Sequence, residues 1–69
     1  MITLNEQIKE VKLEIKFRLS TYEKMVSAGR MRPDVAERRL AIMRSVLATL
    51  EGLVATQPPP RLNEPELDL

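Results

Sequence analysis

The side chains best suited to recognising another molecule lie in the first third of the chain, where apolar and acidic residues recur one helical turn apart. Leu13 and Phe17 are four residues apart, and Glu10 and Glu14 share that spacing. Residues four apart are neighbours on a helix surface. An apolar centre with a polar rim is typical of a transient protein interface. The pattern predicts a protein-binding surface on which Leu13 and Phe17 anchor the partner and Glu10 and Glu14 meet its basic groups.

A group of arginines in the middle of the chain is a second candidate contact region. It contains Arg30, Arg32, Arg38 and Arg39. Guanidinium groups bind carboxylates and phosphates through paired hydrogen bonds, so the group is a possible anchor for an acidic surface or for phosphates. The alternative is a solvated basic end of the fold, because Asp34 lies four residues before Arg38 and can pair with it on a helix.

The composition argues against catalysis. The 69 residues include no cysteine and no histidine, so the chain supplies no thiol nucleophile, histidine base, disulfide or soft-ligand metal site. Gly29 and Gly52 stand alone and form no phosphate-binding loop. Glu10 and Glu14 have no histidine beside them and match surface carboxylates better than an acid–base pair. We therefore expect a protein that is not an enzyme and needs no cofactor.

Local signals place these residues on two helices. Thr3 followed by Glu6 is a capping box, which starts a helix, and Gly29 can take the left-handed conformation that closes one. Pro33 suits the first position of a second helix, because its fixed φ is helical and its missing amide has no partner there. The two expected helices cover about residues 4–28 and 33–55.

Each expected helix carries one apolar stripe at a spacing of three or four residues, which keeps the stripe on one face. The first stripe consists of Leu4, Ile8, Val11, Ile15, Leu19, Tyr22 and Val26. The second consists of Ala36, Leu40, Met43, Leu47, Leu50 and Val54. A short link between helices favours an antiparallel return. The predicted fold is all-α, an antiparallel two-helix hairpin in which the stripes pack together.

The second helix has a further apolar row, about 90° around from its stripe, which a hairpin leaves uncovered. The row consists of Val35, Ile42, Val46 and Leu53. Scattered surface apolar residues are common, but a contiguous exposed patch usually marks an interface. A second copy is the economical partner, since two hairpins can pack as a four-helix bundle. We expect a homodimer with this row at its interface; in an alternative interpretation, Leu13 and Phe17 also belong to the dimer core.

Charge and hydropathy restrict location and partners. The net charge of +1 gives no electrostatic footprint for nucleic acid, which we regard as an unlikely partner. No apolar run approaches the ~18 residues of a membrane span, and the N-terminus lacks the layout of a signal peptide. We expect a cytoplasmic protein without a membrane partner.

The C-terminal residues 58–69 differ from the rest in composition. They begin with three consecutive prolines, which disfavour a helix. They also carry one basic and three acidic residues, a net charge of −2. We expect a hairpin domain over residues 1–57, followed by a proline-rich, acidic and disordered tail.

Two long segments, ITLNEQIKEVKLEI and SAGRMRPDVAERRLAIMRSVLATLEGL, resemble small phage-encoded helical-hairpin proteins of the quorum-sensing anti-activator family of Pseudomonas phages. The resemblance covers about residues 1–54 and is most specific at the turn over residues 27–31 and in the stripe that follows. It implies a dimeric hairpin that binds and inhibits a LuxR-type transcription activator (LasR-like) in the host cytoplasm. It also implies binding to the type IV pilus assembly ATPase (PilB-like). The resemblance assigns no contact residues.

Two other functions compete with inhibition of a host protein. Dimeric hairpins of the Rop type bind RNA with basic side chains around an aromatic, and the corresponding candidates are Lys9, Lys12, Lys16 and Phe17. The glutamates that flank these lysines would repel phosphate. The third function is that of a purely structural oligomerisation module, which captures no host protein.

Deletion of residues 58–69 is expected to change thermal stability little, because the tail's prolines and charge predict no packing on the hairpin. Circular dichroism melts of the full and shortened chains measure this. A large loss of melting temperature would contradict the expectation.

Overall fold

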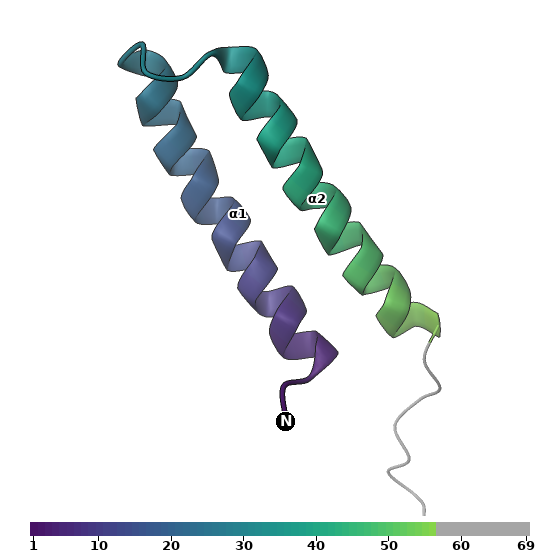
Figure 1. Ribbon diagram of the computed structural model, residues 1–69. Coiled ribbons are helices and arrows are strands. Elements are labelled where there is room, and N and C mark those ends of the chain that lie inside the picture. Colours follow the sequence, from purple (N-terminus) through teal and green to yellow (C-terminus); the bar gives the residue numbers. More distant parts are fainter. Residues whose placement is uncertain (57–69) are drawn as a thin grey trace, which may run out of the picture.

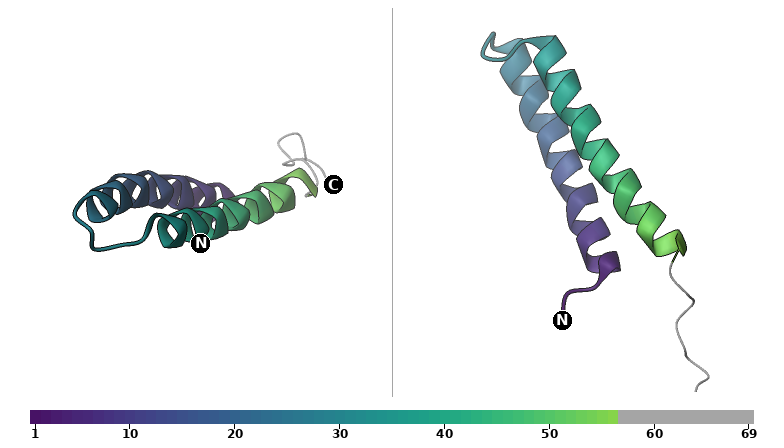
Figure 2. Two further views of the ribbon diagram at one scale, coloured as in Figure 1. Left: turned by 90° about the horizontal axis from the view of Figure 1, so that it is seen from above. Right: turned by 45° about the vertical axis from the view of Figure 1, so that its right-hand side comes forward.

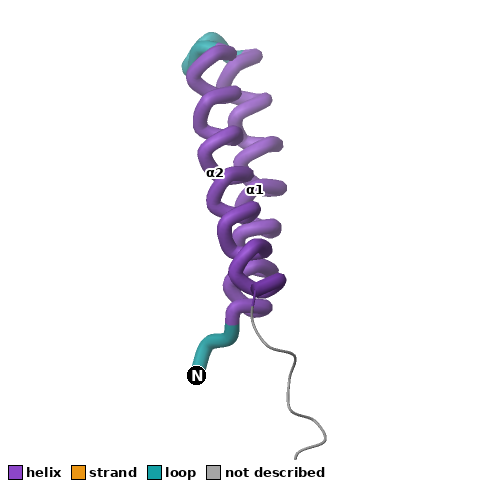
Figure 3. Tube along the Cα trace, turned by 90° about the vertical axis from the view of Figure 1, so that its right-hand side faces the viewer, coloured by secondary structure: helices purple, strands orange, loops and turns teal. Residues whose placement is uncertain are grey.

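The computed structural model describes residues 1–56, which contain two α-helices and no strand. Helix α1 spans Leu4–Ser27 and helix α2 spans Pro33–Thr56. The helices run antiparallel and side by side from the turn that joins them (Figure 1). The views from above and from the side agree that they form a single layer (Figures 2 and 3). The predicted hairpin is confirmed, with helix ends within one residue of those expected, while the predicted tail lies outside the described residues.

The start of α1 is closed by the capping box that the sequence predicts. The Thr3 amide donates to Glu6 Oε1 at 3.1 Å, and the Glu6 amide donates to Thr3 Oγ1 at 3.1 Å. Thr3 itself has extended backbone angles, as an N-cap residue should. Two backbone amides that the helix cannot satisfy internally therefore have partners.

The end of α1 forms a Schellman motif around Gly29. Gly29 has φ +73°, and its amide donates to the Val26 carbonyl at 3.0 Å. The Arg30 amide donates to the Met25 carbonyl at 2.8 Å, which completes the motif. Because these bonds turn the backbone out of the helix, the chain reverses within a few residues and α2 begins at Pro33.

The core of the hairpin is small and lies near the turn. Tyr22, Ala36 and Leu40 are the buried apolar residues of the described chain, and three partly buried residues pack against them, Met25, Val26 and Met31. The remaining stripe residues other than Leu19 are half-buried: Leu4, Ile8, Val11, Ile15, Met43, Leu47, Leu50 and Val54. A core of this size rarely contributes more than about 3–5 kcal/mol to folding.

One member of the predicted stripe lies outside the packed seam. Leu19 is 46% exposed, so the expectation that it packs in the seam was wrong. The steps from Val11 to Ile15 and from Ile15 to Leu19 are both four residues, and each advances about 40° beyond a full turn. Leu19 therefore lies at the edge of the stripe, where α2 covers it only in part.

The left-handed conformation of Gly29 leads to a stability prediction with an internal control. A Cβ added at Gly29 or at Gly52 would meet no atom within 4 Å, so only backbone conformation distinguishes the two sites. Gly29→Ala should destabilise the fold by about 1 kcal/mol, because φ is positive there. Gly52→Ala, inside α2, should stabilise it by up to about 1 kcal/mol.

Thermal melts followed by circular dichroism measure both variants, and a change of 1 kcal/mol corresponds to about 4–8 °C for a small domain. Equal shifts in the same direction for the two variants would show that the Gly29 conformation does not matter to stability.

Candidate functional site

The outer side of α1 carries an apolar patch formed by Leu13 and Phe17, which we call the α1 patch. Leu13 is 44% exposed and Phe17 is 58% exposed. At about 100° per residue, the two side chains point roughly 140–180° away from the stripe that contains Leu4 and Tyr22. The structure thus leaves both predicted anchors exposed and adjacent, where they are accessible to another molecule.

The two acidic residues predicted beside this patch have different surroundings. Glu14 is half-buried and its Oε2 accepts a hydrogen bond from Arg18 Nε at 2.7 Å. That bond raises the pKa of the Arg18 guanidinium above its ordinary value, the nearby Tyr22 acts in the same direction, and burial opposes them. Glu10 is exposed and has no ion pair within residues 1–56. Glu10 is therefore the carboxylate of the pair that is more accessible to a partner.

Lysines lie on the rim of the α1 patch beside Glu10, as the RNA-binding alternative expects. An open hollow of about 400 Å³ beside the patch is lined by Lys9, Glu10, Lys12, Leu13 and Lys16. Lys12 Nζ lies 3.8 Å from Glu51 Oε2, whereas Lys9 and Lys16 make no ion pair in the described part of the chain. Lys9 and Lys16 are four and three residues from Leu13, and this spacing predicts that they lie beside Leu13 on the helix surface.

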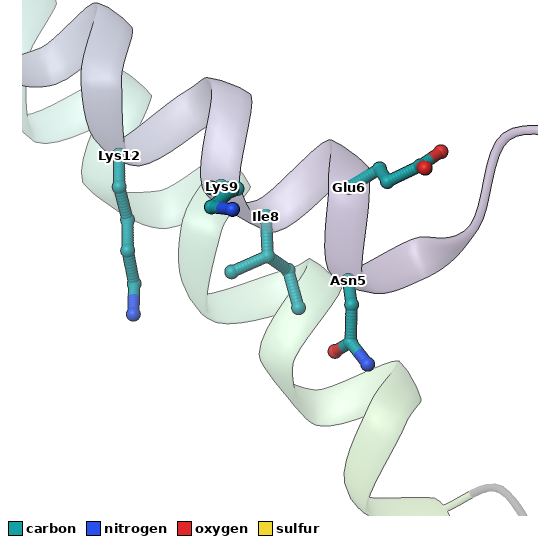
Figure 4. A pocket seen from close by; sticks show the side chains of 5 residues that line it. All are labelled: Asn5, Glu6, Ile8, Lys9 and Lys12. Carbon is teal, nitrogen blue, oxygen red and sulfur yellow. The ribbon is translucent and has the colours of Figure 1, made fainter.

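A second open hollow, of about 330 Å³, lies near the start of α1. Its lining consists of Asn5, Glu6, Ile8, Lys9 and Lys12. Figure 4 shows Asn5, Ile8 and Lys12 projecting on the same side of α1, while Glu6 points away from them. Glu6 is held by the capping box, so this end of α1 offers an apolar wall beside an amide and an ammonium group.

An apolar groove of about 370 Å³ lies between the helices close to the turn. Its lining consists of Leu19, Tyr22, Glu23, Val26, Ser27, Pro33, Ala36, Glu37 and Leu40. The exposed Leu19 and the small Ala36 lie among apolar neighbours, and Glu23 and Glu37 are exposed carboxylates in the lining. Because both helices contribute to this groove, the spacing of residues along one helix does not predict it.

The arginines of the turn region do not share one set of contacts. Arg32 donates to Asp34 through Nε at 3.1 Å and through a terminal nitrogen at 2.8 Å. Asp34 thus pairs with Arg32 and not with Arg38, the partner that the sequence also allowed. The planar guanidinium of Arg32 reaches both carboxylate oxygens. Arg30 and Arg38 are exposed, and Arg38 projects from the outer side of α2, about 160° around from Leu40. Arg32 is therefore the arginine of this group that forms an ion pair within residues 1–56.

The apolar row of α2 is exposed along its whole length, and we call it the α2 row. Its members are Val35 (39% exposed), Ile42 (50%), Val46 (41%) and Leu53 (48%). The contact between Glu51 and Lys12 joins the two helices on one face of the hairpin. At about 100° per residue, the row lies roughly 160° around α2 from Glu51. The α2 row therefore lies on the opposite face, the same face as the Glu14–Arg18 pair.

Comparisons with known proteins add no assignment to these surfaces. No family model, curated protein or solved structure matches this chain. Within residues 1–56, neither helix is both long and apolar enough to cross a membrane. The same residues contain no group of three acidic side chains placed to hold a metal ion.

The different environments of two stripe leucines lead to a second stability prediction. Leu40→Ala removes a buried side chain and should destabilise the fold by about 2–5 kcal/mol. Leu19→Ala removes a largely exposed one and should cost less than about 1 kcal/mol. Urea titration of both variants measures the difference, and equal losses would show that Leu19 is packed in solution.

Proposed function

We propose that this chain is a non-enzymatic phage protein that binds a host transcription activator of the LuxR type and inhibits it. Binding occurs in the host cytoplasm through the α1 patch. The exposure of Leu13 and Phe17 on the outer side of α1 is the observation that supports a binding role. The resemblance of residues 1–54 to the anti-activator family supports the choice of target, and it makes the pilus assembly ATPase a second target.

The physical basis of the proposed binding is burial of an exposed aromatic and its aliphatic neighbour. Truncation of a well-packed interface anchor typically costs about 2 kcal/mol or more in binding. Phe17 and Leu13 have much of their surface available for burial, since they are 58% and 44% exposed. Two straight helices joined by a hydrogen-bonded turn present the pair on a preorganised surface, which reduces the entropy lost on binding.

Charges around the patch would orient the partner. Lys9 and Lys16 line the hollow beside Leu13 together with Glu10, while Glu14 is engaged by Arg18. An activator surface that offers an apolar pocket with carboxylates around it is therefore complementary, and Glu10 selects for one basic group. Inhibition follows by occlusion, because a helix bound over the DNA-contacting or dimerising face of an activator excludes its normal partner.

RNA binding is the competing function that the same face supports. Its candidate residues are Phe17 with Lys9, Lys12 and Lys16. Lys9 and Lys16 form no ion pair among the described residues, whereas Lys12 Nζ lies 3.8 Å from Glu51 Oε2. Arginine and lysine contacts to phosphate make binding steeply dependent on salt. A protein interface centred on two apolar side chains depends on salt much less, which separates the two functions experimentally.

The double change Leu13→Ala with Phe17→Ala is expected to weaken binding of the purified activator about thirtyfold, equivalent to about 2 kcal/mol, because the apolar anchors are lost. The circular dichroism melt should change little, since both residues are exposed. Leu19→Ala, an exposed leucine at the edge of the stripe, is the matched control and should bind normally.

Several outcomes would contradict this proposal. Unchanged binding by the double variant would place the activator site on another surface, and failure of the unmodified chain to bind would remove the activator as a target. Retention of RNA that falls steeply between low and moderate salt would favour the RNA-binding function. The same titration with the pilus assembly ATPase tests the second target separately.

A further inference from the structure

The groove beside the turn has an apolar floor to which both helices contribute. Helix α1 supplies Leu19, Tyr22 and Val26, and helix α2 supplies Ala36 and Leu40. Tyr22, Ala36 and Leu40 belong to the core, so the packing that holds the hairpin together also fixes the shape of the floor. From Leu19 to Val26 the wall rises about 11 Å at 1.5 Å per residue, which is the length of two helical turns. A short helix therefore fits along the groove.

Leu19 gives this groove an exposed apolar contact. Its side chain belongs to the apolar stripe of α1 and is nevertheless 46% exposed. Its neighbours in the lining include the buried Tyr22 and Leu40. An apolar side chain of another molecule that enters the groove would thus remove aliphatic surface from water on both partners, which is favourable.

The groove also carries two carboxylates, Glu23 on α1 and Glu37 on α2. Both are exposed, and neither forms an ion pair within residues 1–56. No lysine or arginine lies three or four positions from either residue, so neither has a basic neighbour one helical turn away. None of the described residues that line the groove is basic. The groove therefore presents negative charge around an apolar floor, in a chain whose net charge is +1.

The walls of the groove favour a helical occupant over an extended one. The backbone amides and carbonyls along the walls are used within α1 and α2, so the groove offers few backbone partners to an extended peptide. A helix satisfies its own backbone groups. Its side chains also recur every three or four residues, so apolar residues on one face can meet the floor while basic residues on both sides reach Glu23 and Glu37.

The groove lies on a different face from the α2 row. At about 100° per residue, Glu23 is roughly 20° around α1 from Lys12. Glu37 is roughly 40° around α2 from Glu51. The groove is thus on the face that carries the Lys12–Glu51 contact, and the α2 row is on the opposite face. A molecule in the groove leaves the α2 row uncovered.

From these features we propose that the groove binds a basic amphipathic helix of another protein. Aliphatic side chains of that helix pack against Leu19 and Ala36, and its lysines or arginines pair with Glu23 and Glu37. The bound helix lies along α1 and α2 as a third packed helix. The groove selects a basic partner, whereas the lysines beside the α1 patch favour an acidic one. This second site does not depend on the proposed function.

A synthetic helix tests the charge and apolar requirements directly. The probe is a fluorescein-labelled helix of about three turns, with leucines along one face and lysines on both sides of them. An internal staple holds it helical, because free helices of this length are marginal in water. Its counterpart has glutamate at every lysine position. Fluorescence anisotropy with the full chain should show saturable binding of the lysine helix and about tenfold weaker binding of the glutamate helix. Equal binding of the two would overturn the proposal.

Removal of the two carboxylates tests their part in this selection. Glu23→Gln with Glu37→Gln keeps the size of both side chains and should weaken binding of the lysine helix about fivefold, since exposed ion pairs contribute modestly. The matched control is Glu10→Gln with Glu51→Gln, which changes the net charge equally at two glutamates outside the lining. The control should bind normally. Equal losses would show that overall charge attracts the probe, which would overturn the proposal.

Charge reversal gives a result that a general loss of structure cannot produce. Glu23→Lys with Glu37→Lys should bind the glutamate helix more tightly than the lysine helix, because the groove then carries positive charge. Circular dichroism checks that this variant is folded. A folded variant that keeps the original preference would overturn the proposal.

The apolar contact is tested by Leu19→Ala, which should weaken binding of the lysine helix about tenfold with little change in the melt, since Leu19 is largely exposed. Leu13→Ala with Phe17→Ala should bind this helix normally, and the reverse pattern would place the probe on the α1 patch. Loss of self-association in Leu19→Ala, measured by sedimentation equilibrium without the probe, would assign the groove to a second copy. Either result would overturn the proposal. All of these measurements are made without the activator, so failure of this proposal and failure of the proposed function are distinguished.

Discussion

Two helices packed side by side can cover only one strip of each other's surface, and this limit shapes the whole molecule. Tyr22, Ala36 and Leu40 are buried where the strips meet near the turn, while most of the seam is half-buried. Apolar residues more than about 90° from the seam have no third element to cover them. The α1 patch and the α2 row are direct consequences of this geometry, and so is the small size of the core.

The ion pairs within the hairpin decide which charges face outward. Glu14 is engaged by Arg18, Asp34 by Arg32, and Lys12 by Glu51 across the two helices. Exposed pairs of this kind contribute little to stability, but each removes a charge from the set available to a partner. The rim of the α1 patch therefore has more accessible ammonium groups than carboxylates, although its sequence alternates the two.

The two exposed apolar surfaces differ in the partner that their chemistry favours. The α2 row consists of four exposed aliphatic residues along α2, which is the basis for expecting a second copy of the chain there. The α1 patch is short, contains the aromatic Phe17 and has a mixed rim, which suits a different protein. Because the two surfaces lie on different sides of the hairpin, self-association and partner binding need not compete.

Local signals within the sequence were sufficient to predict the helices and the turn. The capping box at Thr3 and the Gly29 motif involve atoms of residues that lie only a few positions apart. The exposure of Leu13, Phe17 and the α2 row also followed from helical periodicity. The four-residue spacing of Glu14 and Arg18 also favours the ion pair that they form. Tertiary structure alone decided the exposure of Leu19, the Lys12–Glu51 contact and the groove beside Ala36. These features depend on how closely and in what register the two helices meet, which the spacing of residues along one helix does not specify.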